Sequence, residues 1–207
     1  SICDGLTEVE LWGEWYDIET TTSIHLYDQG LTYSIPSEIG CLTNLTYLYY
    51  TGELSGEIPP EIGNLTNLTY LSLMTNQLTG EIPPEIGNLT NLTFLSLSAG
   101  FLNQGLITGE IPVEIGNLTN LTNLYLKDNL LTGEIPSEIG NLTSLIYLWL
   151  QDNLLTGEIP SEIGNLTSLI GLNLENNQIT GEIPSEIGNM TNLTFLSLHT
   201  NELTGSI

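Results

Sequence analysis

An internal repeat of 24 residues constrains this chain more than any other feature. The frame LTYLSLMTNQLTGEIPPEIGNLTN begins at Leu68 and restarts at Leu92, Leu121, Leu145, Leu169 and Leu193, with one longer spacing of 29 residues after Leu92. Leu45 opens a 23-residue unit, and Thr21 opens a degenerate first unit. We therefore expect an N-terminal cap over residues 1–20, followed by seven full repeats and a truncated eighth over residues 21–207.

Each unit has the pattern of one coil of a solenoid. The leucines of LxxLxL alternate with period two, as in a short strand with one buried face. An Asn at position 9 can bond the backbone of neighbouring coils; it occurs as Asn76, Asn129, Asn153, Asn177 and Asn201. Gly at position 13 and Pro at position 16 exclude a long helix from the return path. Such a coil is stable only when it stacks on its neighbours.

The unit LxxLxLxxNxLTGEIPxEIGNLTN resembles the plant-type leucine-rich repeat, a class found in receptor-kinase ectodomains, polygalacturonase-inhibiting proteins and secreted bacterial repeat proteins. The resemblance implies an α/β repeat solenoid that is rich in β-structure. It would be a right-handed, curved superhelix with a parallel sheet on its concave side and 3₁₀ turns on its convex side. Membership of this class names no ligand, because function depends on the surface positions.

Aromatic residues gather at positions 3 and 5, whose side chains should point out of the concave sheet. The candidate ligand-binding residues are Tyr47, Tyr49, Tyr70, Phe94, Tyr125, Tyr147, Trp149 and Phe195, with Lys127 as an orienting cation. Stacked rings could simply stabilise the sheet, where β propensity favours them. Exposed aromatic groups rimmed by polar residues are also typical of recognition surfaces, so we favour non-catalytic binding of a protein or glycan. Lys127 could equally form a local ion pair with Asp128.

The charge excludes several classes of partner. Twenty-five acidic residues stand against one basic residue, which gives a net charge of −24. A chain with one cationic side chain cannot neutralise phosphates, so we expect no nucleic-acid partner and no attraction to an anionic membrane. No run of eighteen apolar residues exists to insert into a bilayer.

Glutamates form two columns, one at position 14 from Glu57 to Glu182 and one at position 18 from Glu38 to Glu186. We interpret them as a solvated face, with weak binding of divalent cations such as Ca²⁺ as the alternative. We expect no other cofactor and no dedicated metal site. His25 and His199 belong to the first and eighth units, and no nucleophile or phosphate loop accompanies them, so we expect no enzyme.

The two cysteines, Cys3 and Cys41, are expected to form a disulfide that links the cap to the solenoid. That bond favours an extracellular or cell-surface location, and two unpaired thiols are the alternative. Sequons of the type Asn-x-Thr make Asn44, Asn64, Asn88, Asn117 and Asn141 candidates for N-glycosylation. A structural role in the turn would also explain them, because NLT is part of the repeat.

Three further features suggest possible functions. The fourth unit contains an insertion, in which Phe101 and Leu102 could fold over the concave edge. The last coil lacks a C-terminal cap, so copies of the chain could assemble end to end into a fibre through Leu196, Leu198, Leu203 and Ile207. Threonine columns at positions 12 and 23 suggest ice binding as a lower alternative, since we expect aromatic residues and glutamates to interrupt them.

Overall fold

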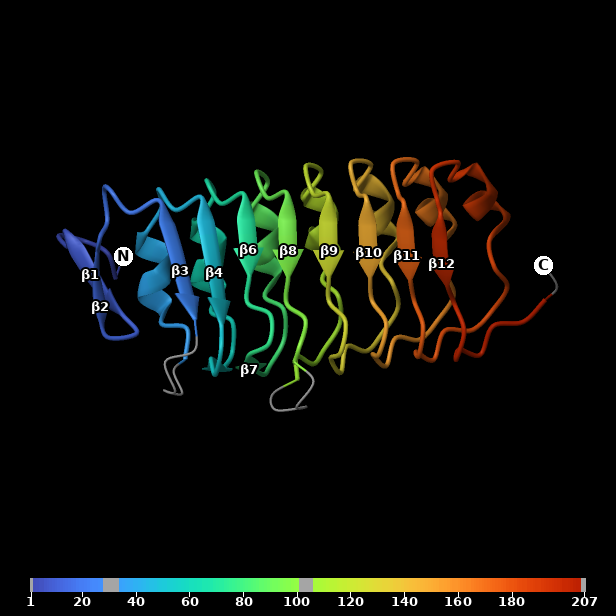
Figure 1. Cartoon of the computed structure of the whole chain (residues 1–207), viewed down its shortest axis with the longest axis horizontal. Coiled ribbons are helices and arrows are strands. Elements are labelled where there is room, and N and C mark those ends of the chain that lie inside the picture. Colours follow the sequence, from blue (N-terminus) through green and yellow to red (C-terminus); the bar gives the residue numbers. More distant parts are fainter. Residues whose placement is uncertain (1, 28–33, 101–105, 206–207) are drawn as a thin grey trace.

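The computed structural model describes residues 2–27, 34–100 and 106–205. The coils stack along one axis, and eight strands form one parallel sheet, in which each strand pairs with the strand of the next coil (Figure 1). Equal positions of successive repeats pair: Tyr47 is opposite Tyr70, and Tyr70 is opposite Phe94. The strands are β3 (Ser23–Tyr27), β4 (Tyr47–Thr51), β6 (Tyr70–Ser72), β8 (Phe94–Ser96), β9 (Asn123–Tyr125), β10 (Tyr147–Trp149), β11 (Gly171–Asn173) and β12 (Phe195–Ser197).

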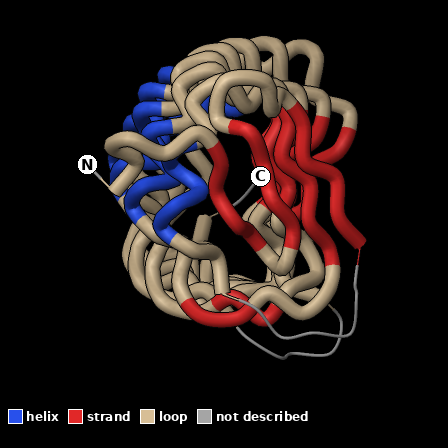
Figure 2. Tube along the Cα trace, turned by 90° about the vertical axis from the view of Figure 1, so that its left-hand side faces the viewer, coloured by secondary structure: helices blue, strands red, loops and turns tan. Residues whose placement is uncertain are grey.

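Seven short 3₁₀ helices lie on the side of the solenoid opposite the sheet (Figure 2). Each follows directly after a proline, whose ring holds φ near the helical value, and each has a glutamate in its first turn. No α-helix occurs in the described ranges, so the predicted β-rich solenoid with 3₁₀ turns is confirmed. The helices are η1 (Ser37–Cys41), η2 (Pro60–Asn64), η3 (Pro84–Asn88), η4 (Val113–Asn117), η5 (Ser137–Asn141), η6 (Ser161–Asn165) and η7 (Ser185–Asn189).

The return path of each coil pairs briefly with that of the next. Strands β5 (Ser55–Gly56) and β7 (Gln77–Leu78) are parallel partners, and isolated bridges such as Glu134 to Thr156 continue the pairing along the later coils. Gly133, at position 13 of the repeat, has φ +73°, a left-handed conformation that glycine adopts without a steric penalty. The position-13 glycines therefore shape the turn from which the return path begins.

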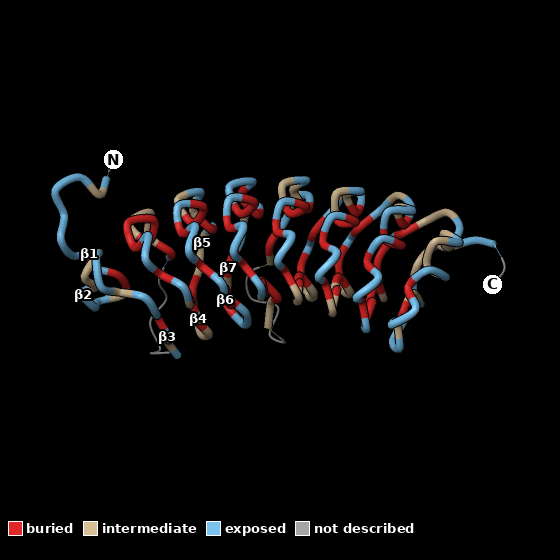
Figure 3. Tube along the Cα trace, turned by 90° about the horizontal axis from the view of Figure 1, so that it is seen from above, coloured by how far each residue is buried: buried red, intermediate tan, exposed pale blue. Residues whose placement is uncertain are grey.

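The inward leucines form one continuous core along the solenoid (Figure 3). Leu145, Leu148 and Leu150 are fully buried, and so are their equivalents in the other interior coils. A hairpin of β1 (Glu8–Leu11) and β2 (Glu14–Asp17) extends this core at the N-terminal side, because Val9 and Leu11 are buried in it. The hairpin and the first coils are also joined covalently, since the predicted disulfide between Cys3 and Cys41 is confirmed.

The position-9 asparagines form the predicted hydrogen-bond ladder. Asn153 is buried; its Nδ2 donates to the carbonyl oxygens of Leu126 and Leu150 at 3.0 Å each. Its Oδ1 accepts from the Leu131 amide at 3.1 Å. One side chain thus satisfies backbone groups of its own coil and of the preceding coil, in an interior where unpaired groups are costly.

We expect Asn153→Ala to lower the free energy of unfolding by about 2 kcal/mol. The substitution leaves the buried Leu131 amide without a partner, and it removes one of the two asparagine hydrogen bonds that the Leu126 and Leu150 carbonyl oxygens each accept. Urea denaturation measures the change. Asn165→Ala is the matched control, since Asn165 is exposed, and it should change the stability by less than about 0.5 kcal/mol. Equal losses in the two variants would contradict the structural role of the ladder.

Salt should stabilise the solenoid, because like-charged glutamates stand one coil apart along both columns. Each neighbouring pair costs on the order of 1 kcal/mol in a water-like dielectric before screening. We expect the melting temperature to rise by several degrees between about 10 mM and 1 M NaCl. The variant Glu110→Gln/Glu134→Gln should show a smaller rise, and a melting temperature that does not depend on NaCl would refute this account.

Candidate functional site

The in-register sheet gathers the aromatic residues of positions 3, 5 and 7 into one surface, which we call the aromatic strip. It contains His25, Tyr27, Tyr47, Tyr49, Tyr70, Phe94, Tyr125, Tyr147 and Trp149. Each ring contacts at least one other, so the strip runs without a break from β3 to β10. The strands lie on the inner side of the shallow arc that the coils follow (Figure 3). The strip therefore occupies the concave face.

Tyr47, Tyr70 and Phe94 form a stacked column within the strip. The ring centroids of Tyr47 and Tyr70 are 4.5 Å apart with an interplanar angle of 13°, and those of Tyr70 and Phe94 are 4.4 Å apart at 7°. Both faces of the Tyr70 ring are thus covered by neighbouring rings. This column offers a ligand ring edges and phenol hydroxyls rather than open faces.

Beyond Phe94 the ring geometry changes, because position 3 of the next repeat is Asn123, the first residue of β9, and not an aromatic residue. The Asn123 Nδ2 donates to the Tyr125 hydroxyl at 2.7 Å, and Tyr125 meets the Phe94 ring edge-to-face at 5.4 Å. Tyr125, Trp149 and Tyr147 then form a second group of tilted and edge-on rings, with the centroids of Tyr125 and Trp149 5.0 Å apart. The strip consequently has two parts with different ring orientations.

Gly171 allows the Tyr147 ring to lie over the next strand. A Cβ atom at Gly171 would be 2.9 Å from Tyr147 Cδ1, closer than real Cβ contacts. Any side chain at this position would have to displace the ring. The glycine at position 3 of this repeat is the sequence signal that could have indicated this arrangement.

Buried polar atoms without a hydrogen-bond partner are concentrated on the concave face. Across the described chain, all five such side-chain atoms occupy positions 5 and 7: Ser72 Oγ, Ser96 Oγ, Ser98 Oγ, Trp149 Nε1 and Gln151 Oε1. Unpaired buried polar atoms are rare in stable proteins and need an explanation. Gln151 was not among the residues indicated by the sequence. These atoms set the concave face apart from the rest of the solenoid.

The charged residues of this face lie past the ends of β9, β10 and β11. Lys127 Nζ is 3.1 Å from an Asp128 carboxylate oxygen, so the local ion pair that was the alternative to a ligand contact is present. Asp152 accepts a hydrogen bond from the Asn176 amide at 2.8 Å, and Glu175 lies 3.1 Å from the His199 ring. Lys127 is therefore not available as an unpaired cation for a ligand.

Burial raises the pKa of the Tyr70 and Tyr125 hydroxyl groups above the ordinary value for tyrosine. An ordinary tyrosine hydroxyl is already protonated at neutral pH, and the raised pKa extends that range, so both groups can donate hydrogen bonds. The same burial places the two rings partly within the sheet surface, so each presents only part of its area to a ligand.

Several candidate residues lie apart from the strip. Phe195 of β12 is half exposed, and in the described part of the chain no ring contact joins it to the other aromatic residues. Leu196 of the last coil is 44% exposed, whereas Leu198 and Leu203 are partly buried against the core. Ile207, Phe101 and Leu102 fall outside the described residues. Self-association through the last coil stays a prediction.

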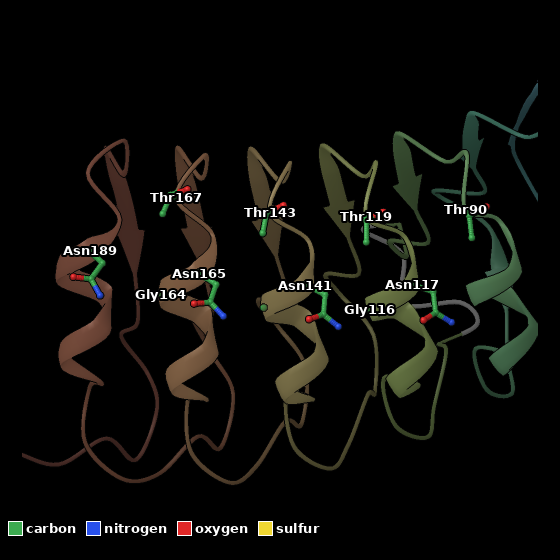
Figure 4. A pocket seen from close by; sticks show the side chains of 11 residues that line it. Thr90, Gly116, Asn117, Thr119, Asn141, Thr143, Gly164, Asn165, Thr167 and Asn189 are labelled. Carbon is green, nitrogen blue, oxygen red and sulfur yellow. The ribbon is translucent and has the colours of Figure 1, made fainter.

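The convex side carries a shallow groove of about 1080 Å³ between the 3₁₀ helices and the turns that lead into the strands (Figure 4). Only glycine, asparagine and threonine line it, including Asn117, Asn141, Thr119 and Thr143. The expected interruption by glutamates and aromatic residues is therefore wrong for the position-23 threonines. The groove takes its lining from positions 20, 21 and 23, away from the strip. The position-18 glutamates lie next to its glycines, since a Cβ atom at Gly140 would be 2.7 Å from Glu162 Cβ.

The glycosylation candidates separate into two kinds. Asn44 donates through Nδ2 to the Glu19 carbonyl oxygen at 2.9 Å, so its amide is already used. Asn64, Asn88, Asn117 and Asn141 are exposed at the last residue of η2 to η5. Their modification stays a prediction.

Among the described residues, no group of three or more histidine, cysteine, aspartate or glutamate side chains is arranged to hold a metal ion. Weak cation binding by the glutamate columns stays a prediction. No helix among the described residues is long and apolar enough to cross a membrane.

The model for the leucine-rich repeat region matches residues 26–128 and 101–206. The chain belongs to the leucine-rich-repeat family. It superimposes with a TM-score of 0.84 and 42% identity on the ectodomain of the Arabidopsis thaliana receptor kinase GASSHO1/SCHENGEN3, solved in complex with CASPARIAN STRIP INTEGRITY FACTOR 2. The match covers 88% of this chain and 22% of that one.

Two other solved structures are informative. The plant peptide hormone receptor RGFR1 in complex with RGF2 matches with a TM-score of 0.82 and 40% identity, over 88% of this chain and 28% of the receptor. A plant ice-binding protein matches with a TM-score of 0.72 and 30% identity, over 87% of this chain and 65% of that protein. The chain thus spans less than a third of the length of either receptor. The comparison with curated proteins returned no match.

Proposed function

We propose that this leucine-rich-repeat chain is a non-catalytic recognition scaffold that binds a polypeptide ligand through the aromatic strip. The observation that carries the proposal is the continuous chain of rings on the concave face, together with the five unpartnered polar atoms on the same face. Aromatic residues dominate the energetics of protein interfaces, and buried polar atoms without partners can gain hydrogen bonds from a ligand.

The similar receptors support a polypeptide ligand, since RGFR1 is a peptide hormone receptor solved with RGF2. The ring geometry also favours a polypeptide over a glycan, for an independent reason. A sugar stacks on the open face of a ring, and both faces of Tyr70 are covered by Tyr47 and Phe94. Ring edges and hydroxyls instead suit backbone carbonyl groups and apolar side chains.

We further propose an extracellular or cell-surface location. The disulfide between Cys3 and Cys41 persists in oxidising compartments and is rare in the cytosol. The similar ectodomain of GASSHO1/SCHENGEN3 belongs to a membrane receptor kinase, which is consistent with this placement.

Ice binding is the second candidate, and the convex groove favours it. Columns of exposed asparagine and threonine repeat at the coil spacing of about 4.8 Å and form a regular array of polar groups (Figure 4). The similarity to a plant ice-binding protein adds support. This function would use the face opposite the aromatic strip, so the two candidates can be tested separately.

Truncation of the strip should weaken peptide binding. Peptides selected on the immobilised chain from a displayed library of random 12-residue sequences are the probe. We expect Tyr147→Ala/Trp149→Ala to weaken their binding by about 30-fold, because buried aromatic anchors carry much of an interface's energy. The convex variant Asn141→Ala/Thr143→Ala should bind as the parent chain does. Unchanged binding in the concave variant would exclude the strip, and glycan-array binding without peptide binding would favour the glycan alternative.

Ice binding would separate the freezing and melting temperatures of a solution of the chain. We expect Thr143→Tyr to remove most of that gap, because a large ring breaks the flat array of the groove. Thr156→Tyr, a position-12 threonine outside the groove, should retain it. Absence of any gap in the parent chain at millimolar concentration would dismiss this candidate without affecting the first.

A further inference from the structure

The interior of the concave face, from β4 to β11, has two halves that differ in charge. The first coil lies outside this comparison and has Asp28 at position 8. Equivalent seven-residue windows cover positions 2 to 8 of each coil. No charged side chain occurs in the windows that include β4, β6 and β8, which are residues 46–52, 69–75 and 93–99. Four charged residues occur in the windows that include β9, β10 and β11: Lys127, Asp128, Asp152 and Glu175. These windows are residues 122–128, 146–152 and 170–176. With one positive and three negative groups, the second half has a net charge of −2.

The acidic half cannot neutralise itself. Lys127 is paired with Asp128 at 3.1 Å, which uses the single lysine of the chain. Asp152 receives its hydrogen bond from the uncharged amide of Asn176. Glu175 contacts the Ser197 hydroxyl and the ring of His199, which is charged only when it is protonated. Two carboxylates on neighbouring coils therefore lack a permanent cationic partner in the described structure.

Aromatic rings project from the strands that lead to these carboxylates. Tyr125, Tyr147 and Trp149 belong to β9 and β10, the strands after which Asp128 and Asp152 follow. We call these three rings, together with the carboxylates of Asp128, Asp152 and Glu175, the acid-flanked cluster. A ring quadrupole attracts a guanidinium or ammonium group, and a carboxylate can bind the same group by charge-assisted hydrogen bonds. The cluster therefore has two kinds of partner for a cation on one surface.

The unpartnered polar atoms of this half indicate a ligand that presents hydrogen-bond donors and acceptors in addition to a cation. Trp149 Nε1 is a donor and Gln151 Oε1 is an acceptor, and both are buried without a partner on β10 and just after it. The backbone of a polypeptide supplies a carbonyl acceptor and an amide donor at regular intervals. Reaching the two atoms requires their side chains to turn, because neighbouring groups cover them.

We propose that the acid-flanked cluster binds an arginine- or lysine-bearing segment of a polypeptide, while the uncharged half of the strip binds the adjoining apolar segment. This inference rests on the proposed function of the strip. It specifies both the chemistry of the partner and its placement along the solenoid. An acidic segment is excluded from the cluster, because the one lysine is already paired and the carboxylates repel it.

The high net charge of the chain makes a control essential. Twenty-four excess negative charges attract any basic peptide and speed its encounter, without holding it at one site. Binding at the cluster must therefore be separated from general attraction. Glu134 and Glu158 provide the control, because they are exposed on neighbouring coils in the position-14 column, away from the concave face.

The experiment compares arginine with citrulline, which has nearly the same shape and no charge. Peptides selected on the intact chain are resynthesised with each arginine replaced by citrulline and titrated by calorimetry at about 150 mM salt, where general attraction is screened. On the parent chain we expect the replacement to weaken binding about tenfold, as for partly desolvated charge pairs. Asp152→Asn/Glu175→Gln should reduce this effect to less than about threefold, whereas Glu134→Gln/Glu158→Gln should leave it at about tenfold.

The possible outcomes separate this inference from the function on which it rests. Equal loss of the citrulline effect in both double variants would assign it to general attraction and overturn the inference. Selected peptides that lack arginine and lysine but still require Tyr147 and Trp149 would also overturn it, and would leave the recognition function standing. Selected peptides that do not require these rings would refute the recognition function itself.

Discussion

The in-register stacking of coils is the constraint on which the rest of this structure depends. Parallel pairing sets Tyr47 opposite Tyr70 and Tyr70 opposite Phe94, so every position of the repeat stands beside its own equivalent. A residue type that recurs at one position becomes a column about 4.8 Å in period. Apolar columns bury one another, amide columns such as the one through Asn153 exchange hydrogen bonds, and glutamate columns repel. The stability and the surface chemistry of the chain therefore both follow from one spacing.

Much of the fold could be predicted because the repeat pattern determines which side chains face inward. The eight-strand parallel sheet, the 3₁₀ helices, the asparagine ladder and the disulfide of Cys3 and Cys41 all agree with the sequence interpretation. The grouping of rings on one face could also be predicted, because positions 3 and 5 alternate with the buried leucines. These features depend on the period of the pattern and are insensitive to details of side-chain packing.

The orientation of the rings could not be predicted, because it depends on each ring's neighbours. Tyr70 stacks since Tyr47 and Phe94 occupy the same position on both sides, whereas Asn123 interrupts the column and leaves Tyr125 edge-on to Phe94. Tyr147 lies over β11 only because residue 171 is a glycine. The difference matters for function: a covered ring face cannot stack on a sugar, so the same composition suits a different ligand once the packing is known.

The backbone explains part of the acidity of the concave face and leaves part of it unexplained. Position 8 is left-handed in successive coils, with φ of 59° at Asp128, 57° at Asp152 and 53° at Asn176, and aspartate and asparagine tolerate this conformation better than most residues. Thr75 occupies the same conformation at φ 58° despite its branched Cβ, so the turn does not require an acid. Glu175 stands at position 7, where no such backbone constraint applies. The carboxylates that follow β9, β10 and β11 therefore go beyond what the turn demands, and their position on the face that also holds the unpartnered polar atoms argues for a role in binding.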